Sequence, residues 1–241
     1  MGRIAGLCVL TALVVPATAS ASQVIGQTAP PEDGCFSSLT YVQVGLTSGA
    51  AYGTATRGVV TSWSTYGGSA TGRLALVTMH PNLAGGAGAV TFDAKDVIRD
   101  VAPGALNTFS GVHLPIAAGG QIGLHVPFNA PGSCVFSVPA ATDTYAFIIG
   151  NSNPGDAGTV GDTTGKGFSR VNASAVVEPD ADVDGFGDET QDQCSTDPST
   201  QGSCAVALTQ TKKKKCKKKR HRRQSAGSAK KHKRCHKKHK R

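Results

Sequence analysis

Residues 35–178 consist of short runs of β-forming residues separated by Gly, Ser, Asn and Pro. The runs recur about every 8–12 residues, a spacing typical of β-sandwiches and barrels. No window keeps its apolar residues at helical spacing, and about 140 residues suffice to bury one core. We therefore predict an all-β domain, an antiparallel β-sandwich with jelly-roll-like topology. The expected strands are Thr40–Leu46, Gly58–Thr65, Arg73–His80, Ala89–Phe92, Val97–Val101, Asn107–Ile116, Gln121–Val126, Cys134–Val138, Thr144–Ile149 and Val171–Val177.

One hairpin can be predicted in detail around the turn Ala118-Gly119-Gly120. A turn centred on Gly119 sets His113 opposite His125, with both imidazoles on the face away from the core. Such a pair binds a metal only with a third ligand, which the sequence does not identify, and two solvated histidines are the alternative. The apolar residues that alternate along the two arms are Val112, Leu114, Ile116, Ile122, Leu124 and Val126.

Trp63 is the only tryptophan of the chain. A lone tryptophan in a strand is most often a core residue, whereas an exposed ring could stack on a sugar. Trp63 is expected on the same strand face as Val59 and Thr61, with Tyr66 on the other. We predict a core position for Trp63.

No catalytic motif is present, because the chain lacks G-x-S-x-G, H-E-x-x-H and a phosphate-binding glycine loop. Two carboxylates could meet across a sheet as an acid–base pair, but the sequence does not place any two at catalytic separation. We therefore expect a binding or structural domain rather than an enzyme, with an exported polysaccharide-active enzyme as the alternative. The acids considered are Glu32, Asp33, Asp93, Asp96, Asp100, Asp143, Asp156 and Asp162.

The N-terminus has the features of a secretory signal peptide. Arg3 precedes an apolar run from Ile4 to Val15, and small residues follow, which predicts cleavage after Ala19 or Ala21. The apolar run is too short to span a bilayer. The chain is therefore expected outside the cell, in an oxidising environment.

Six cysteines remain after Cys8 is removed with the signal peptide. They allow 15 pairings in principle, so the connectivity stays a hypothesis. The composition divides them into three regions with two cysteines each. This division predicts the disulfides Cys35–Cys134, Cys194–Cys204 and Cys216–Cys235.

An acidic segment follows the predicted domain, after Glu178-Pro179. Carboxylates at alternate positions followed by glycine form the first half of an EF-hand-like calcium loop, in which the oxygens converge on one cation. Position 12 of an EF-hand requires an acid, but Gln191 stands there and Asp192 follows. An unstructured acidic spacer is the alternative. The predicted calcium ligands are Asp180, Asp182, Asp184, the Phe186 carbonyl, Asp188 and Asp192.

Residues 180–194 resemble a thrombospondin type 3 repeat, whose pattern is D-x-D-x-D-G-x-x-D-x-x-D-x-C. The resemblance implies that the aspartates wrap calcium and that Cys194 forms a disulfide. One extra residue separates Asp188 from Asp192, and only one copy is present. Eight acids lie between Glu178 and Asp197, so the segment is expected to be loose without metal and ordered by calcium.

The charge is divided sharply along the chain. Residues 212–241 contain 18 of the 25 Lys and Arg and no acid, so a body of charge −9 precedes a tail of +18. The tail lacks an apolar set to bury, which predicts disorder. Its spacing of Cys216, His221, His232, Cys235, His236 and His239 matches no zinc finger.

A polycation of this density binds polyanions through counterion release. For an exported chain we expect anionic envelope polymers as partners, with extracellular nucleic acid as an alternative. Without calcium, the acidic segment could pair with the tail instead. The polyanion-binding residues are expected to include Lys212, Lys213, Lys214, Lys215, Lys217, Lys218, Lys219, Arg220, Arg222 and Arg223.

The layout as a whole resembles exported actinobacterial proteins with a β-rich domain, one such acidic repeat and a Lys/Arg-rich tail. The resemblance implies an extracellular location and no activity. We expect a secreted cell-surface binding or structural module, with a glycan as a possible ligand by analogy of fold. The expected organisation is a signal peptide (1–21), a linker (22–34), the β-sandwich (35–178), the acidic calcium segment (179–204) and a disordered basic tail (205–241).

Overall fold

The computed structural model describes residues 21–31, 34–130, 132–149, 152–161 and 167–205. The predicted signal peptide up to Ser20, Glu32, Asp33, Asp162 and the basic tail from Val206, with Cys216, Cys235 and the polyanion-binding residues, lie outside these ranges. The described chain is all-β, as predicted, with strands joined by turns and one short 3₁₀ helix, η1 (Leu83–Gly85). None of the described residues forms a helix that could cross a membrane.

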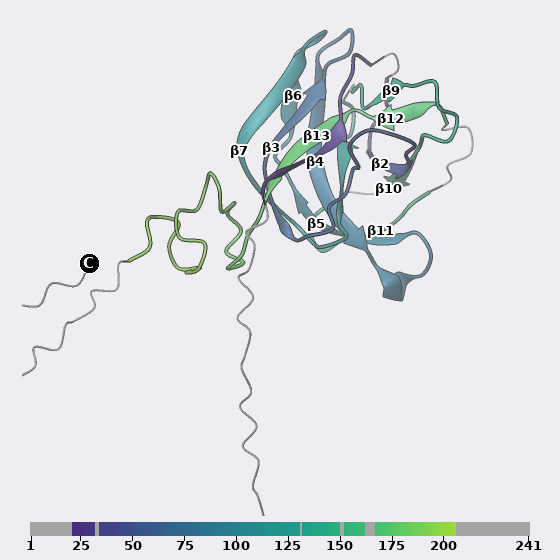
Figure 1. The fold of residues 1–241 in the computed structure, drawn as a ribbon. Coiled ribbons are helices and arrows are strands. Elements are labelled where there is room, and N and C mark those ends of the chain that lie inside the picture. Colours follow the sequence, from purple (N-terminus) through teal and green to yellow (C-terminus); the bar gives the residue numbers. More distant parts are fainter. Residues whose placement is uncertain (1–20, 32–33, 131, 150–151, 162–166, 206–241) are drawn as a thin grey trace, which may run out of the picture. The chain divides into compact units, whose positions relative to one another are not determined.

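Two antiparallel sheets make up the body of the domain (Figure 1). The four-stranded sheet has the order β1 (Gln23–Gln27), β13 (Ala173–Glu178), β3 (Gly58–Tyr66) and β7 (Leu106–Ile116). The seven-stranded sheet has the order β10 (Thr144–Ile149), β2 (Leu39–Gly45), β8 (Gln121–Val126), β4 (Gly72–Pro81), β5 (Ala89–Lys95) and β11 (Ala157–Thr159), with β6 (Arg99–Val101) also paired to β4. A short ladder joins β9 (Val135–Ser137) to β12 (Ser169–Val171).

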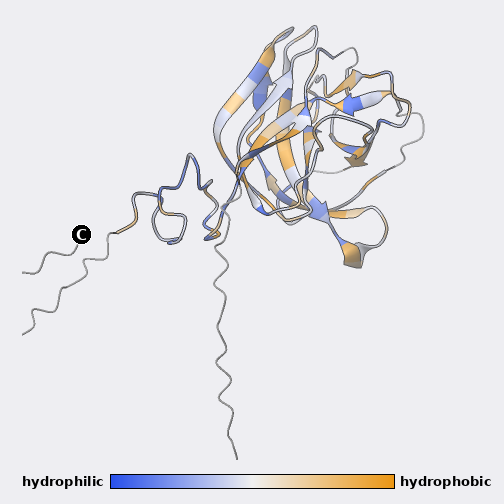
Figure 2. Cartoon of the chain, viewed as in Figure 1, coloured by the Kyte–Doolittle hydropathy of each residue, from blue (hydrophilic) through white to orange (hydrophobic). Residues whose placement is uncertain are grey.

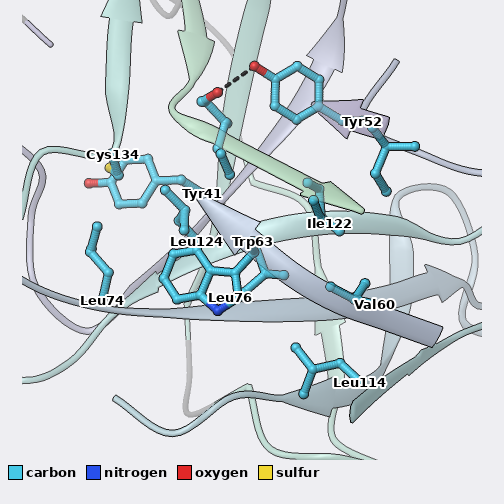
Figure 3. Close-up of a cluster of buried hydrophobic side chains, with 14 of the residues drawn as sticks. Tyr41, Tyr52, Val60, Trp63, Leu74, Leu76, Leu114, Ile122, Leu124 and Cys134 are labelled. Atoms are coloured by element: carbon cyan, nitrogen blue, oxygen red, sulfur yellow. Dashed lines mark hydrogen bonds between the residues drawn. The ribbon is translucent and has the colours of Figure 1, made fainter. Parts of the chain in front are cut away.

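The main core lies between the inner faces of the two sheets. Every second residue of β5 is buried. Hydrophobic residues are distributed along the strands of the domain (Figure 2). Trp63 is 1% exposed and donates its indole N–H to Asp96 at 2.8 Å, so its predicted core position is confirmed. Leu76, Leu124 and Tyr41 reach the same cluster from the seven-stranded sheet, which explains why the two sheets hold together (Figure 3).

A second buried cluster lies on the opposite face of the seven-stranded sheet. It contains Val42, Val77, Phe92 and Ile148, and Val160 packs against it. Gly158 of β11 comes so close that an added Cβ would lie 2.6 Å from Ile148 Cγ2. The segment around β11 therefore covers an apolar patch that would otherwise face solvent.

The predicted hairpin of β7 and β8 is wrong. β7 pairs with β3, and β8 pairs with β2 and β4, so the two strands lie in different sheets and the turn at Gly119 carries the chain across the sandwich. The alternation was read correctly, because both strands bury their apolar residues between the sheets. His125 is buried opposite Thr40, not exposed opposite His113.

A further difference concerns residues 22–34, which were expected to be a linker. Gln23–Gln27 forms the edge strand β1 and pairs with β13. The stretch QVIGQ is short and contains Gly26 at φ +74°, so nothing local marks it as a strand. β11 was also not predicted, because Ala-Gly-Thr has weak β propensity and is fixed only by pairing with β5.

Two of the predicted disulfides are confirmed. Cys35 bonds to Cys134 with Cα atoms 5.9 Å apart, and Cys194 bonds to Cys204 with Cα atoms 4.7 Å apart. The first joins two distant parts of the sandwich, and the second closes a loop within the acidic segment. Both fit a protein that resides outside the cell.

Candidate metal centre

The acidic segment leaves the end of β13 and curls tightly. Val183 (φ +67°) and Gly185 (φ +87°) take left-handed backbone conformations. The Asp180 carboxylate closes the curl by accepting the backbone N–H groups of Asp184 and Gly185 at 3.1 and 3.2 Å. Short-range bonds of this kind are what aspartates at alternate positions favour in turns.

The curl brings three of the predicted ligands together. Asp180, Asp182 and Asp184 each place a carboxylate oxygen within 4.8 Å of the other two. This is the one group of at least three His, Cys, Asp or Glu side chains with that geometry in the described part of the chain. Oxygen-only clusters suit hard cations. The cluster can therefore hold a metal ion.

The carboxylate oxygens of this segment are incompletely hydrogen-bonded. Both oxygens of Asp182 and Oδ2 of Asp192 are buried and have no hydrogen-bond partner among the described residues. Asp192 as a whole is only 3% exposed. A buried ionised oxygen without a partner is costly, and a cation bound among these carboxylates would satisfy all three atoms.

The same carboxylates repel one another. Burial and the charges of Asp184, Asp192 and Asp180 raise the pKa of Asp182 above its usual range, against the opposing effect of the nearby Asp184 N–H, which lies outside hydrogen-bonding geometry to Asp182 and donates to Asp180. Burial likewise raises the pKa of Asp188, with contributions from Asp180, Asp182 and Asp192, against a backbone hydrogen bond from Ala181. Asp188 and Asp192 therefore act on the same small volume as the triplet, although they are not members of the 4.8 Å group.

The extra residue before Asp192 is accommodated by a turn. The backbone N–H groups of Gln191 and Asp192 both donate to the Gly187 carbonyl at 2.9 Å. The Gln191 side chain points to the sandwich and donates to the Val112 carbonyl at 2.9 Å. Asp192 stays with the carboxylates, and its Oδ1 accepts the Cys194 N–H at 2.7 Å.

Phe186 and Asp188 are held by bonds within the segment. The Phe186 N–H donates to Asp184 Oδ1 at 2.8 Å, and its ring packs edge-on against His113 with centroids 4.7 Å apart. Asp188 accepts the Ala181 N–H with both oxygens, at 3.3 and 3.2 Å. The role of the Phe186 carbonyl as a ligand stays a prediction.

Glu178 joins the segment to the sandwich, and sequence reasoning missed it. Its Oε1 accepts the hydroxyls of Thr61 and Thr190 at 3.0 and 2.7 Å, and its Oε2 accepts the N–H groups of Glu189 and Thr190 at 3.1 and 2.9 Å. Burial favours a higher pKa for Glu178, but these hydrogen bonds outweigh it and lower the pKa. Both carboxylate oxygens of the buried Glu178 are occupied by these four hydrogen bonds, so Glu178 is a structural clasp that holds the segment to the sandwich.

The other predicted candidates are engaged elsewhere. His113 and His125 lie apart, and His125 Nδ1 is 3.1 Å from Thr40 Oγ1. The sandwich acids that the structure describes bond to basic or polar neighbours, and none of them pairs with another of these acids. The pairs are Asp93 with His80, Asp96 with Arg99 and Trp63, Asp100 with Arg73, Asp143 with Arg170, and Asp156 with the Asn153 N–H. None of these contacts brings a third ligand to a histidine in the described chain.

The chain matches no protein-family model, no curated protein and no solved structure.

Proposed function

We propose that the acidic segment is a calcium site and that the protein is a calcium-stabilised extracellular binding or structural module. The observation that carries the proposal is the set of buried oxygens of Asp182 and Asp192 that have no hydrogen-bond partner. A cation among the five aspartates would satisfy these oxygens and cancel their repulsion. The resemblance to a thrombospondin type 3 repeat supports the same assignment.

The donor set favours calcium over other common ions. All five candidate side chains offer carboxylate oxygens, and calcium takes six to eight such ligands in flexible geometry. Zinc and copper prefer nitrogen and sulfur donors, and both cysteines of the segment are joined in a disulfide. Magnesium requires a stricter octahedral shell and keeps its waters, which suits a crowded carboxylate cluster poorly.

Calcium binding would act on the sandwich as well as on the segment. A ligand that binds only the folded segment stabilises it, and the segment is bonded to β13 and β3 through Glu178 and to β7 through Gln191. Calcium would thus fix the end of the four-stranded sheet. The basic tail would retain the module on anionic envelope polymers through counterion release.

The calcium site is tested by calorimetric titration of the full chain. The wild-type protein is expected to bind calcium saturably at or below about millimolar concentration, as extracellular modules do. Asp182→Asn should weaken binding by about tenfold or more, ~1.4 kcal/mol. Asp100→Asn, which changes an exposed aspartate of β6, is the control and should bind as the wild type does. Absence of saturable binding to the wild-type chain would exclude the site.

Tail retention is tested separately by deleting residues 212–241. The full chain should stay with cells at low salt and be released as the salt concentration rises, because counterion release makes binding salt-dependent. The truncated chain should appear in the medium under both conditions. Equal cell association of both chains at low salt would refute this role of the tail.

A further inference from the structure

The acidic segment and the four-stranded sheet border an open hollow of about 400 Å³. Thr61 and Ser62 of β3, Ser110 of β7 and Val176 of β13 line it from the sheet. Thr190 and Gln191 line it from the acidic segment, beside Glu178. The hollow therefore has two walls, one from a rigid sheet and one from the segment that carries the candidate calcium site.

The sheet wall presents free hydroxyl groups. Ser62 and Ser110 are cross-strand partners in the β3–β7 register. Neither side chain bonds to any other group that the structure describes, whereas the next pair along these strands, Ser64 and Thr108, bond to each other at 2.9 Å. Beside them, Gly111 leaves open space where a side chain would stand. The hollow thus offers two solvent-accessible hydroxyls that no described protein group occupies, beside an uncrowded backbone.

The lining is neutral toward a ligand. Glu178 is its one carboxylate, and four hydrogen bonds from within the protein already occupy that group. No Lys, Arg or His is among the lining residues. Val176 and the Gly111 backbone add apolar surface between the hydroxyls. Hydroxyl and amide groups around an apolar patch match the C–H face and hydroxyl rim of a sugar ring, and they offer no counter-charge to an ion.

The second wall depends on the fold of the acidic segment. Thr190 donates hydrogen bonds from its hydroxyl and its N–H to the Glu178 carboxylate, and the Gln191 side chain donates to the Val112 carbonyl. Both residues lie within two positions of Asp192, whose buried Oδ2 has no hydrogen-bond partner among the described residues. A cation bound by Asp192 would fix the chain one residue after Gln191 and two after Thr190, and so would add to the Glu178 and Val112 contacts that position this wall.

We infer that this hollow is a calcium-gated binding site for a neutral saccharide unit. The inference rests on the proposed calcium site, since calcium supplies the gate. The sheet wall is present without the metal, but the ligand is held only when the segment wall stands opposite. No aromatic ring lines the hollow, so binding relies on hydrogen bonds and shape.

The test is saturation-transfer NMR on the full chain with a panel of neutral monosaccharides and their disaccharides, in calcium and in chelator. At least one saccharide should receive transfer in calcium only. Ser110→Trp fills the hollow and should weaken that binding by about tenfold or more, ~1.4 kcal/mol. Thr108→Trp, on the same strand and face but outside the hollow, is the matched control and should retain it. The double variant Ser62→Ala/Ser110→Ala removes the hydroxyls without added bulk and should also lose binding.

Each other outcome overturns the inference. Transfer that persists in chelator refutes the gate, and transfer that survives Ser110→Trp and the double alanine variant refutes the location. Equal loss in Ser110→Trp and Thr108→Trp refutes the hollow as a distinct site. Calorimetry on the same samples separates the two proposals. Calcium binding without transfer to any saccharide would refute this inference alone, whereas the absence of calcium binding would refute the proposed function itself.

Discussion

Gln201 donates a hydrogen bond to Asp184 Oδ2 at 2.9 Å, across 17 residues of chain. Gln201 lies inside the loop closed by the Cys194–Cys204 disulfide, and its carbonyl accepts the Gln193 N–H at 3.0 Å. At the start of the same loop, the Cys194 N–H donates a hydrogen bond to Asp192 Oδ1. The disulfide loop therefore positions two of the five aspartates, Asp184 and Asp192, through hydrogen bonds.

This contact predicts that Gln201→Ala lowers calcium affinity although Gln201 is not itself a predicted ligand. A hydrogen bond to a charged group contributes about 1.5–3 kcal/mol, so we expect the calcium affinity to fall by at least about tenfold. Ser199→Ala, in the same loop but bonded only to Asp197, is the control for calorimetry. Unchanged affinity in Gln201→Ala would show that the loop does not position Asp184.

Asp192→Asn is expected to act in opposite directions with and without metal. In chelator, it removes a charge whose Oδ2 lacks a partner, so the segment should become more protected against hydrogen exchange. In calcium, it removes a ligand and should lower the affinity. The control is Asp197→Asn, an exposed residue outside the cluster. Lower protection in chelator with unchanged affinity would mark Asp192 as purely structural.

Gly187→Ala is predicted to uncouple the segment from the sandwich. A Cβ at this position would lie 2.4 Å from Glu178 Oε2 and 2.7 Å from Thr61 Cγ2, so the clasp must open. Hydrogen exchange should show that calcium protects the amides of β3 and β13 in the wild type but not in the variant. Gly202→Ala, with its nearest atom 3.7 Å away, should behave as wild type. Full calcium protection in Gly187→Ala would contradict the coupling.

Asp143→Ala should destabilise the sandwich strongly. Asp143 is fully buried, pairs with Arg170 and accepts the N–H and hydroxyl of Thr47 at 2.6 and 2.7 Å. Removing one partner of a buried ion pair costs about 3–5 kcal/mol. Asp100→Ala breaks an exposed pair with Arg73 and should cost at most about 1 kcal/mol. Denaturant unfolding measures both, and equal losses would contradict the difference in burial.

His125 should make the fold sensitive to acid. Burial, with the nearby charge of Lys95, lowers the pKa of His125 from its ordinary 6.5 to about 4. The unfolded chain therefore takes up a proton at a higher pH than the folded chain does. The contribution of neutral His125 to the free energy of unfolding is fully present above pH 6.5 and decreases as the pH falls toward 4. His125→Gln should flatten this part of the stability profile, measured by urea unfolding. A difference between the two proteins that stays constant over that interval would contradict it.

The sequence predicted the class of the fold because strand patterning is local, but it did not predict which strands pair. The strands that begin their apolar alternation at Val112 and Ile122 show the same pattern whether they form a hairpin or lie in two sheets that face each other across a core. The bulge in β3 between Val60 and Ser62 also changed the expected face of Trp63, which packs with Val60 rather than with Val59 and Thr61. Pairing and bulges depend on distant partners, which periodicity does not encode.

The candidate site was more predictable than the sandwich, because its ligands lie close together in sequence. The triplet of Asp180, Asp182 and Asp184 follows from their spacing around a curl. The residues that hold the triplet in place do not follow from spacing, because Glu178 and Gln201 belong to no sequence motif. Only the folded chain shows that Glu178 bonds the segment to the sandwich and that Gln201 donates to Asp184. A sequence signal for such supports would require their partners to be known first.

The position of β13 has a consequence for the order in which the domain is built. Among the described residues, β13 is the last strand and lies between the first strand, β1, and β3, so the four-stranded sheet is incomplete until residue 178 is available. Contacts between such distant parts of a chain form slowly. A chain that stopped before β13 would expose the edge of β3 and leave β1 unpaired, and such edges invite aggregation. Because the acidic segment directly follows β13, calcium bound there would stabilise the sandwich only after the four-stranded sheet has formed.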